Sequence, residues 1–318
     1  MIEVEGLRKS FGEVEALRGV TLSIPRGAVG LLGPNGAGKS TLIRILMGLL
    51  KPGAGSVCVL DIDSVSRPLE VRSRVGYLPE DDCHIPGLSA VGYVAYAAEL
   101  SGLPPGDAIR RAHEVLDYVG MDEERYRLVE TYSSGMRQRI KLAQAVVHDP
   151  ELLFLDEPTN GMDPSGREDM LELIRDICSL GGVSVLLSSH LLPDVEEVCD
   201  HIVVLGLGTV RLQGNLAELR LTDGNCFDLR LKGETTGFLE RVSEIGGEVH
   251  PAAGGLLRVS LPKETSAKKL VEFAHQTGVQ IRHLRVARNT LEEVFMEAMH
   301  EGESWSEASA TGAPDADT

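Results

Sequence analysis

With 318 residues, of which 42% are hydrophobic, the chain is long enough to form one large domain with a buried core and a smaller companion. Its 31 basic and 48 acidic residues give a formal net charge of −17, which argues against a surface that coats nucleic acid, although not against a local basic patch. The five cysteines are scattered without a Cys-x-x-Cys pair, and every apolar stretch is far shorter than the roughly 18 residues that span a bilayer, so we expect a reduced, cytosolic protein.

The N-terminal segment, MIEVEGLRKSFGEVEAL, alternates between apolar and polar residues as a strand does, and it does not resemble a signal segment. From there to about residue 220, short apolar strands alternate with glycine-rich turns and helical segments. This pattern predicts an α/β domain over residues 1–220 with a largely parallel central sheet.

A glycine-rich loop, GPNGAGKST, occupies residues 33–41 and fits the pattern G-x-x-x-x-G-K-[ST]. Its glycines allow backbone N–H groups to point at phosphate oxygens, and the helix that follows adds a favourable dipole. Lys39 is expected to reach the β- and γ-phosphates, Ser40 to place its hydroxyl on Mg²⁺, and Thr41 to support the loop. An ordinary glycine-rich turn is the alternative for this segment alone. The predicted phosphate-binding residues are Gly33, Pro34, Asn35, Gly36, Ala37, Gly38, Lys39, Ser40 and Thr41.

After residue 87 the strand pattern stops. The segments SAVGYVAYAAELSG and DAIRRAHEVLDYVG indicate two helices separated by LPPG, and Asp107 is expected to be the N-cap of the second helix. We therefore predict a helical insertion over about residues 87–145.

A second candidate site lies at the end of an apolar strand, in ELLFLDEPTNGMDP at residues 151–164. Two adjacent carboxylates, Asp156 and Glu157, are costly at such a position unless a cation or a reaction uses them. Asp156 fits a Mg²⁺ ligand, directly or through water, and Glu157 fits the base that positions or activates the attacking water. Two solvated acids in a turn are the alternative, which the nearby phosphate loop makes weak.

The segment between these motifs, YSSGMRQRIKLAQAVVHDP, completes a family resemblance. With the phosphate loop before it and the acidic strand end after it, the chain resembles the nucleotide-binding subunit of an ATP-binding cassette (ABC) transporter over about residues 1–300. The resemblance implies ATP and Mg²⁺ as cofactors. It also implies that SSGM is the signature that reaches across a dimer interface to the γ-phosphate of the other subunit, with the hydroxyl of Ser133 and the amide of Gly135 as donors.

Three further positions match the family in register. His190, in LLSSH, resembles the switch histidine that contacts the γ-phosphate, and it joins Glu157 as a predicted catalytic residue. Asp163, in NGMDP, resembles the residue that crosses the dimer interface, and Phe11, in KSFGEVEAL, resembles the aromatic that stacks on adenine. A structural histidine and a core-packing aromatic are the alternatives.

Two positions depart from the family pattern. Members commonly have glutamine at the end of the loop that touches metal and partner, whereas GYLPEDD places Glu80 there. A carboxylate could bind the metal more strongly, which leaves the usual role of this loop open. The signature has Ser134 at a glycine position of the family. We still expect an intact site, with Ser40, Asp156 and Glu80 around the metal.

After about residue 221 the pattern restarts. FDLRL and VQIRHLRVA are typical of strands and TSAKKLVEFAHQTG of a helix, which together predict a small α+β accessory domain over residues 221–300. The following helix has Thr290 and Glu293 at capping-box spacing and an apolar stripe that favours core packing over a partner surface. The acidic segment 301–318 is predicted to be disordered. The first of these helices is expected to place Leu270, Phe273 and Ala274 on one face.

Within the family, YSSGMRQR, PTNGMDP and NTLEEVFMEAM are similar to the ATPases that serve ABC-2 type permeases, which export drugs, lipids, polysaccharides or ions. The resemblance implies a protein that dimerises on MgATP, as a homodimer or with a closely similar second cassette, and that drives a separate integral membrane permease. Such a protein would lie in the cytoplasm, against the inner face of the cell membrane, and would bind no nucleic acid.

Two other classes of function stay open. A soluble ABC ATPase that acts on ribosomes or DNA would be expected to have a second cassette or a long coiled coil, and the sequence shows neither. A regulatory ATP-binding module would fit if Glu80 or the altered signature abolished hydrolysis. Import instead of export is a variant of the transport interpretation, because the permease largely sets the direction.

Overall fold

The structure is a computed structural model, and it consists of two compact units. The large unit comprises Met1–Leu216 together with the chain from Phe295 onward, and the small unit comprises Ala217–Val294. Of residues 301–310 only the backbone is described. The described residues are 1–179, 181–221, 225–252, 255–262 and 265–310.

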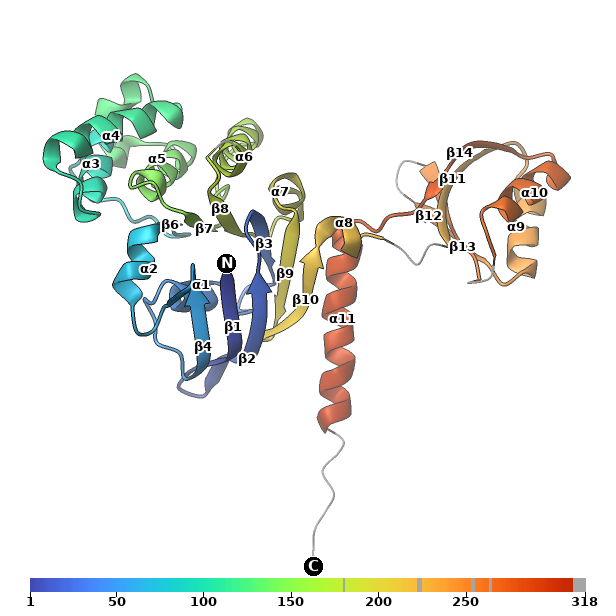
Figure 1. The fold of residues 1–318 in the computed structure, drawn as a ribbon. Helices are drawn as coiled ribbons and strands as arrows, with labels where there is room; N and C mark the ends of the chain where they lie inside the picture. The colour runs from blue at the N-terminus through green and yellow to red at the C-terminus, as the bar shows by residue number, and fades with distance from the viewer. Residues whose placement is uncertain (180, 222–224, 253–254, 263–264, 311–318) are drawn as a thin grey trace, which may run out of the picture. The chain divides into compact units, whose positions relative to one another are not determined.

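A six-stranded sheet forms the centre of the large unit, with the strand order β10-β9-β3-β8-β7-β6 (Figure 1). Neighbouring strands are parallel except for the antiparallel pair of β9 and β10. Every residue of β3, β7 and β8 is buried, which accounts for their near-continuous apolar sequences. The bounds are Ala28–Leu32 (β3), Val75–Leu78 (β6), Leu152–Asp156 (β7), Ser184–Ser188 (β8), His201–Gly206 (β9) and Thr209–Asn215 (β10).

A second, antiparallel sheet of the large unit has the order β2-β1-β4-β5. One buried cluster contains side chains of this sheet, of helix α1 and of the six-stranded sheet. Examples are Leu7 of β1, Ile43 of α1 and Phe154 of β7. Helix α1 is therefore fixed between two sheets. The bounds are Ile2–Phe11 (β1), Val14–Ile24 (β2), Ala54–Val59 (β4), Ile62–Asp63 (β5) and Lys39–Leu46 (α1).

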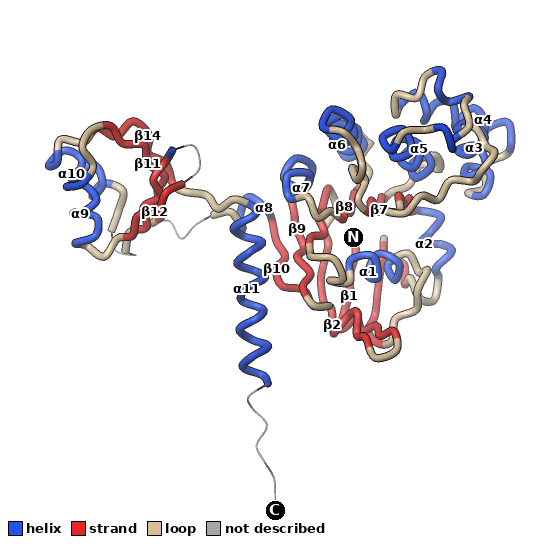
Figure 2. The backbone as a smooth tube through the Cα atoms, turned by 180° about the vertical axis from the view of Figure 1, so that it is seen from behind, coloured by secondary structure: helices blue, strands red, loops and turns tan. Residues whose placement is uncertain are grey.

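From residue 87 the chain forms helices α3, α4 and α5, which lie together (Figure 2), and α5 packs against β6. The predicted capping role of Asp107 is wrong. Helix α4 begins at Pro105, whose fixed φ suits the first helical position, and Asp107 lies in the first turn, where it pairs with Arg110 at 2.7 Å. The helices of the large unit include Pro68–Arg74 (α2), Ala90–Leu100 (α3), Pro105–Tyr118 (α4), Ser134–Val146 (α5), Pro164–Ser179 (α6) and Leu192–Val198 (α7), with 3₁₀ turns at Glu123–Tyr126 and Val129–Thr131.

The small unit is a four-stranded antiparallel sheet of order β12-β13-β11-β14, whose core packs against α9 and α10. Leu270, Phe273 and Ala274, which were predicted to share one helical face, are all buried in α10. Helix α9 and strands β12 and β13 were not predicted. The bounds are Leu216–Leu219 (α8), Cys226–Lys232 (β11), Thr236–Glu244 (α9), Glu248–Ala252 (β12), Leu256–Ser260 (β13), Lys268–Thr277 (α10) and Gln280–Val286 (β14).

The last helix, α11, spans Leu291–Ala310, so it begins in the small unit and continues into the large one. The predicted capping box is confirmed: the Thr290 amide donates to Glu293 Oε2 at 2.8 Å, and the Glu293 amide donates to Thr290 Oγ1 at 3.1 Å. Disorder was expected from residue 301, whereas the helix continues to 310, because a capped helix extends at little cost once it has begun. The rest of the predicted tail lies outside the described residues. In the described parts of the chain, no helix has both the length and the apolar composition needed to cross a membrane.

Candidate functional site

The glycine-rich loop joins β3 to α1 and leaves backbone amides free at the start of that helix. Gly38, the N-cap of α1, has a φ of 103°, which favours glycine, and no side chain caps the helix. A Cβ at Gly33 would lie 2.4 Å from the carbonyl oxygen of Leu205, and one at Gly38 would lie 2.8 Å from that of Ala16. Packing as well as conformation therefore requires these glycines, and the uncapped amides can bind an anion.

Lys39 is preorganised beside this loop. Its side chain is nearly buried, and Nζ donates to the carbonyl of Gly33 at 2.7 Å. Burial lowers the pKa of Lys39, while the negative charges of Glu157, Asp156 and Glu80 oppose that shift. A bound phosphate would add further negative charge, so the ammonium is placed to bind one.

The two adjacent carboxylates lie at the end of β7, with Asp156 3% exposed and Glu157 6% exposed. Glu157 has a φ of 52°, a conformation that is costly for a residue other than glycine. Its amide donates to the carbonyl of Ser188 at 2.9 Å, and its Oε2 lies 2.8 Å from Nδ1 of His190. The strained backbone thus holds the carboxylate against the half-exposed imidazole.

A cavity of about 590 Å³ brings most of the predicted residues together. Ser133, Gly135 and Asp163 do not line it. Ala16 and Asn160 do line it, although no sequence signal marked them. A larger cavity of the same unit, about 720 Å³, contains none of the predicted residues. The lining residues of the smaller cavity are Phe11, Ala16, Pro34, Asn35, Gly36, Ala37, Gly38, Lys39, Ser40, Thr41, Glu80, Asp156, Glu157, Asn160 and His190.

Phe11 lies at the edge of this cavity and outside the core. It is 51% exposed, and the Nζ of Lys9 lies 5.3 Å from the centre of its ring. The core-packing alternative for this aromatic is therefore wrong, and the ring is accessible to a stacking partner. Gly33, in contrast, is absent from the cavity lining.

The predicted metal residues fit a hard cation with oxygen ligands. Among the residues that the structure describes, no group donates a hydrogen bond to the Asp156 carboxylate, and a buried carboxylate without a donor favours a nearby cation. The Ser40 hydroxyl and Glu80 share its cavity. Within the described ranges, no group of three or more His, Cys, Asp or Glu side chains could hold a metal by itself. This fits Mg²⁺, which usually takes one or two carboxylates and completes its shell with phosphate and water.

The signature residues lie at the exposed N-terminus of α5. The Ser133 hydroxyl, at the N-cap, accepts a hydrogen bond from the amide of Met136 at 3.3 Å. Ser134, which departs from the family pattern, donates to the carbonyl of Gly161, in the loop that leads to Asp163. Ser134 therefore links the signature to the loop that contains Gly161 and Asp163 within one chain.

Helix α5 also holds the loop that contains Glu80. Lys141 is 2% exposed, and its Nζ donates to the carbonyls of Pro79 at 2.8 Å and Glu80 at 3.1 Å. Arg137 pairs with Asp82 at 2.9 Å. Sequence analysis missed both contacts, because Lys141 and Arg137 look like ordinary charges on a basic helix. The signature and the Glu80 loop are thus attached to one rigid element.

A buried carboxylate, Asp194, joins three segments around the site and was also missed. It is 0% exposed in the first turn of α7, where an acidic residue is ordinarily solvated. Its Oδ1 accepts from Nε of Arg167, on α6, at 2.5 Å, and its Oδ2 accepts from Oγ1 of Thr159 at 2.5 Å. Thr159 follows Glu157 closely, and α7 follows His190. Asp194 therefore fixes the segments that present both predicted catalytic residues.

Comparison with known protein families gives two matches along the chain. Residues 17–160 match the family described as ABC transporter. Residues 210–299 match the family described as the C-terminal domain of DrrA1-3-like ATP-binding proteins. The first match contains the phosphate loop, the signature and the acidic strand end, and the second includes the whole small unit.

Known relatives span nearly the whole chain. The uncharacterized ABC transporter ATP-binding protein YxlF of Bacillus subtilis is 32% identical over 302 residues, which cover 94% of this chain and 100% of the relative. The daunorubicin/doxorubicin resistance ATP-binding protein DrrA of Streptomyces peucetius is 35% identical over 304 residues, which cover 93% of this chain and 91% of the relative. Among solved structures, the dimeric structure of MJ0796, a bacterial ABC transporter cassette, matches with a TM-score of 0.63 and 25% identity over 68% of this chain and 99% of that chain.

Proposed function

This chain belongs to the family of ABC transporter ATP-binding proteins, and from that premise we propose that it dimerises on MgATP and drives a separate permease in ABC-2 type export. ATP is its nucleotide, and hydrolysis is its reaction. Export is supported by the relative DrrA, which is named for resistance to daunorubicin and doxorubicin, and by the match of the small unit to the DrrA1-3-like C-terminal domain.

The observation that carries this proposal is a half-complete site. The phosphate loop, Asp156, Glu157 and His190 share one cavity, whereas Ser133 and Gly135 lie outside it on an exposed helix N-terminus. A second copy of the chain would bring its own signature to the γ-phosphate. Because each chain has both halves, a homodimer would complete two equivalent sites.

The chain's own residues divide the work in this dimer. The loop amides and Lys39 bind the β- and γ-phosphates, and Glu157 takes the proton of the attacking water. His190, 2.8 Å from Glu157, orients that carboxylate. Ser40 and Asp156 would hold Mg²⁺, which supplies charge neutralisation on the phosphate oxygens when bound.

The signature serine can act without leaving its helix. The Ser133 oxygen accepts from the amide of Met136, and its O–H proton stays available for a phosphate oxygen of the partner's nucleotide. ATP is then a ligand of both chains and favours the closed dimer, and loss of the γ-phosphate weakens it. Since α5 holds both the signature and the Glu80 loop, closure would move that loop and the helical insertion against a permease. The protein would then work at the inner face of the cell membrane.

Affinity capture from native membranes tests the proposal. Membranes are solubilised in mild detergent, the protein is captured, and its partners are identified by mass spectrometry. A multi-span membrane protein at stoichiometric yield is expected. Recovery only from the soluble fraction, with ribosomes, with DNA or alone, would contradict it. A steady-state ATPase assay completes the test, because a regulatory module would bind ATP without turnover.

A further inference from the structure

The small unit presents a charged sheet face that the nucleotide site does not use. Phe227 and Leu229 of β11 are buried in the core with α9 and α10, so Asp228, between them, points to the opposite face. On that face Asp228 is paired across the sheet with Arg258 of β13 and with Arg285 of β14. Three neighbouring strands therefore place a guanidinium, a carboxylate and a guanidinium in one row.

A cavity of about 480 Å³ lies over this row. Its described lining contains four arginines and one carboxylate. Three of the arginines come from the sheet or the segment that follows it, and the fourth precedes the sheet. The lining residues are Arg220, Asp228, Ala252, Leu256, Arg258, Arg285, Val286, Arg288 and Thr290.

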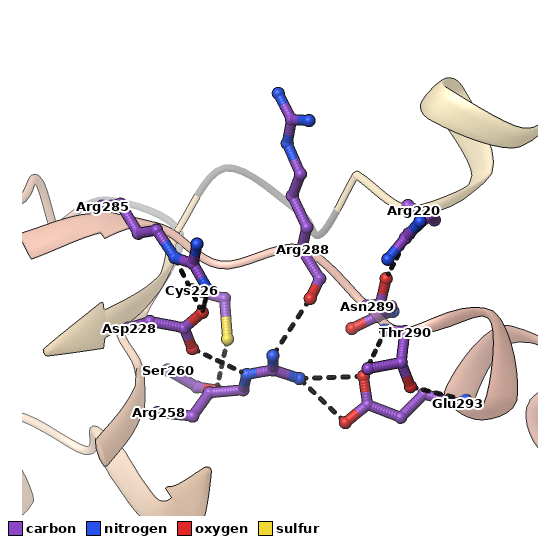
Figure 3. A network of polar contacts seen from close by, with 10 residues as sticks. All are labelled: Arg220, Cys226, Asp228, Arg258, Ser260, Arg285, Arg288, Asn289, Thr290 and Glu293. Carbon is purple, nitrogen blue, oxygen red and sulfur yellow. Dashed lines mark hydrogen bonds and ion pairs between the residues drawn. The ribbon is translucent and has the colours of Figure 1, made fainter. Parts of the chain in front are cut away.

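The floor of this cavity is a fixed ion-pair network (Figure 3). Asp228 is 2% exposed, and its Oδ1 accepts from Nε of Arg258 at 3.1 Å. The other end of the Arg258 guanidinium donates to both carboxylate oxygens of Glu293 at 3.0 Å and to the carbonyl of Arg288 at 3.0 Å. All three nitrogens of the Arg258 guanidinium are thus held by hydrogen bonds, and the side chain connects the sheet to the first turn of α11.

Two guanidinium groups remain available above this floor. Arg285 has a side chain that is 60% exposed, and its donors lie 3.3 and 3.4 Å from Asp228, near the limit of a hydrogen bond. The Arg288 guanidinium points away from the network (Figure 3), and among the described residues it has no partner. Among Arg258, Arg285 and Arg288, the carboxylates of Asp228 and Glu293 offset two positive charges, which leaves a surplus of one.

This positive surplus is local to the cavity. The small unit contains eleven basic and eleven acidic residues, so its formal net charge is zero, and the full excess of −17 belongs to the rest of the chain. The overall charge of the small unit therefore does not account for phosphate binding. Binding at this place would depend on the arrangement of particular arginines.

We propose that this cavity binds a phosphate group through Arg285 and Arg288, above the fixed floor of Arg258 and Asp228. Guanidinium groups form paired, charge-assisted hydrogen bonds with phosphate oxygens, and two of them match the two charges of a phosphate. The phosphate belongs either to a soluble phosphoester or to a phospholipid head group. The site is independent of ATP hydrolysis in the large unit.

The test measures binding of pyrophosphate to the full chain by isothermal titration calorimetry. All proteins carry Lys39→Ala, so that the phosphate loop contributes little. Flotation with phosphatidylglycerol vesicles, and with phosphatidylcholine vesicles for comparison, examines the lipid source. The double variant R285Q/R288Q is expected to bind at least about tenfold more weakly, since each lost charged hydrogen bond is worth that much. The matched control is Arg282→Gln, an exposed arginine on the same strand, which should bind unchanged.

The outcomes separate the sources. Arginine-dependent binding of pyrophosphate supports a soluble ligand, and arginine-dependent flotation with phosphatidylglycerol alone supports a lipid head group. Arg288→Gln by itself should also weaken binding, and because its guanidinium contacts no described residue, this variant should fold normally. Equal binding by R285Q/R288Q and the Arg282→Gln control, or no binding to either probe, overturns the proposal. Neither result depends on whether a permease is captured.

Discussion

Each unit buries one aspartate against arginine, and the two aspartates have different surroundings. Asp194 of the large unit is 0% exposed and joins Arg167 and Thr159 behind the nucleotide cavity. Asp228 of the small unit is 2% exposed and joins Arg258 and Arg285 on the floor of an open cavity. Arg167 and Thr159 have no other described side-chain partner, whereas Arg258 also pairs with Glu293 and Arg285 faces solvent.

This difference shows how one chemical pair serves two purposes. An ion pair whose carboxylate is fully buried fixes the loops around it, because breaking it leaves Arg167 without another described side-chain partner. An ion pair on a cavity floor instead holds one arginine still while its neighbours stay free to bind. The presence of a second partner therefore separates the two sites: Arg167 has no other described side-chain partner, whereas Arg258 also pairs with Glu293.

The largest expected difference between the two units concerns ATP hydrolysis, which only the large unit should catalyse. Glu157→Gln keeps the shape of the site but removes the base, so ATP hydrolysis should fall by about 10²–10⁴-fold while ATP binding persists and a closed dimer accumulates. Phosphate release and gel filtration with ATP measure both effects. Glu248→Gln, an exposed acid of the small unit, is the control. Near-normal phosphate release by Glu157→Gln would remove Glu157 from the mechanism.

The second largest effect is expected at Asp194. Asp194→Ala should lower the free energy of unfolding by about 3–5 kcal/mol, because Arg167 loses its buried partner. Urea unfolding followed by circular dichroism measures the change. Glu172→Ala, an exposed acid on α6, should change stability by no more than about 0.5 kcal/mol. A loss at Asp194 as small as that of this control would show that the network is not structural.

Replacement of Asp228 in the small unit should lower the free energy of unfolding by less than replacement of Asp194. Asp228→Ala should cost about 1–3 kcal/mol, because Arg258 retains Glu293 and the carbonyl of Arg288. The same urea experiment, with hydrogen exchange of the small unit read separately by mass spectrometry, measures it. If Asp228→Ala costs as much as Asp194→Ala, the remaining partners of Arg258 do not account for the difference.

The smallest effect concerns pH and involves the large unit only. Burial lowers the pKa of His148, although its hydrogen bond to the carbonyl of Val75, at 3.1 Å, opposes the shift. Below about pH 6.5 the unfolded chain binds a proton at this histidine more readily than the folded chain does. The free energy of unfolding should therefore decrease as the pH is lowered, by at most about 1.4 kcal/mol per pH unit for one proton. His148→Gln should reduce the change in the urea midpoint between pH 7 and 5.5. His250→Gln, which replaces an exposed histidine of the small unit, should leave that change as it is. An unchanged slope in His148→Gln would assign the dependence to other groups.

The sequence by itself determined the chemistry that depends on neighbours along the chain. The phosphate loop, the two carboxylates at a strand end and the capping box of Thr290 and Glu293 are each set within a few residues, so spacing alone predicts them. The same holds for the α/β class of the large unit and for several elements of the small one. Short-range geometry has few solutions for such motifs.

The tertiary structure alone decided which distant residues meet. Asp194 joins Thr159 and Arg167, and Lys141 holds the Glu80 loop. Helix α11 begins at the end of the small unit, but from Phe295 onward it belongs to the large unit. The contacts of Asp228 with arginines on two other strands depend on sheet order and register. The physical reason is that a charged side chain looks the same in sequence whether it is solvated or buried, and only packing settles which partner replaces its water.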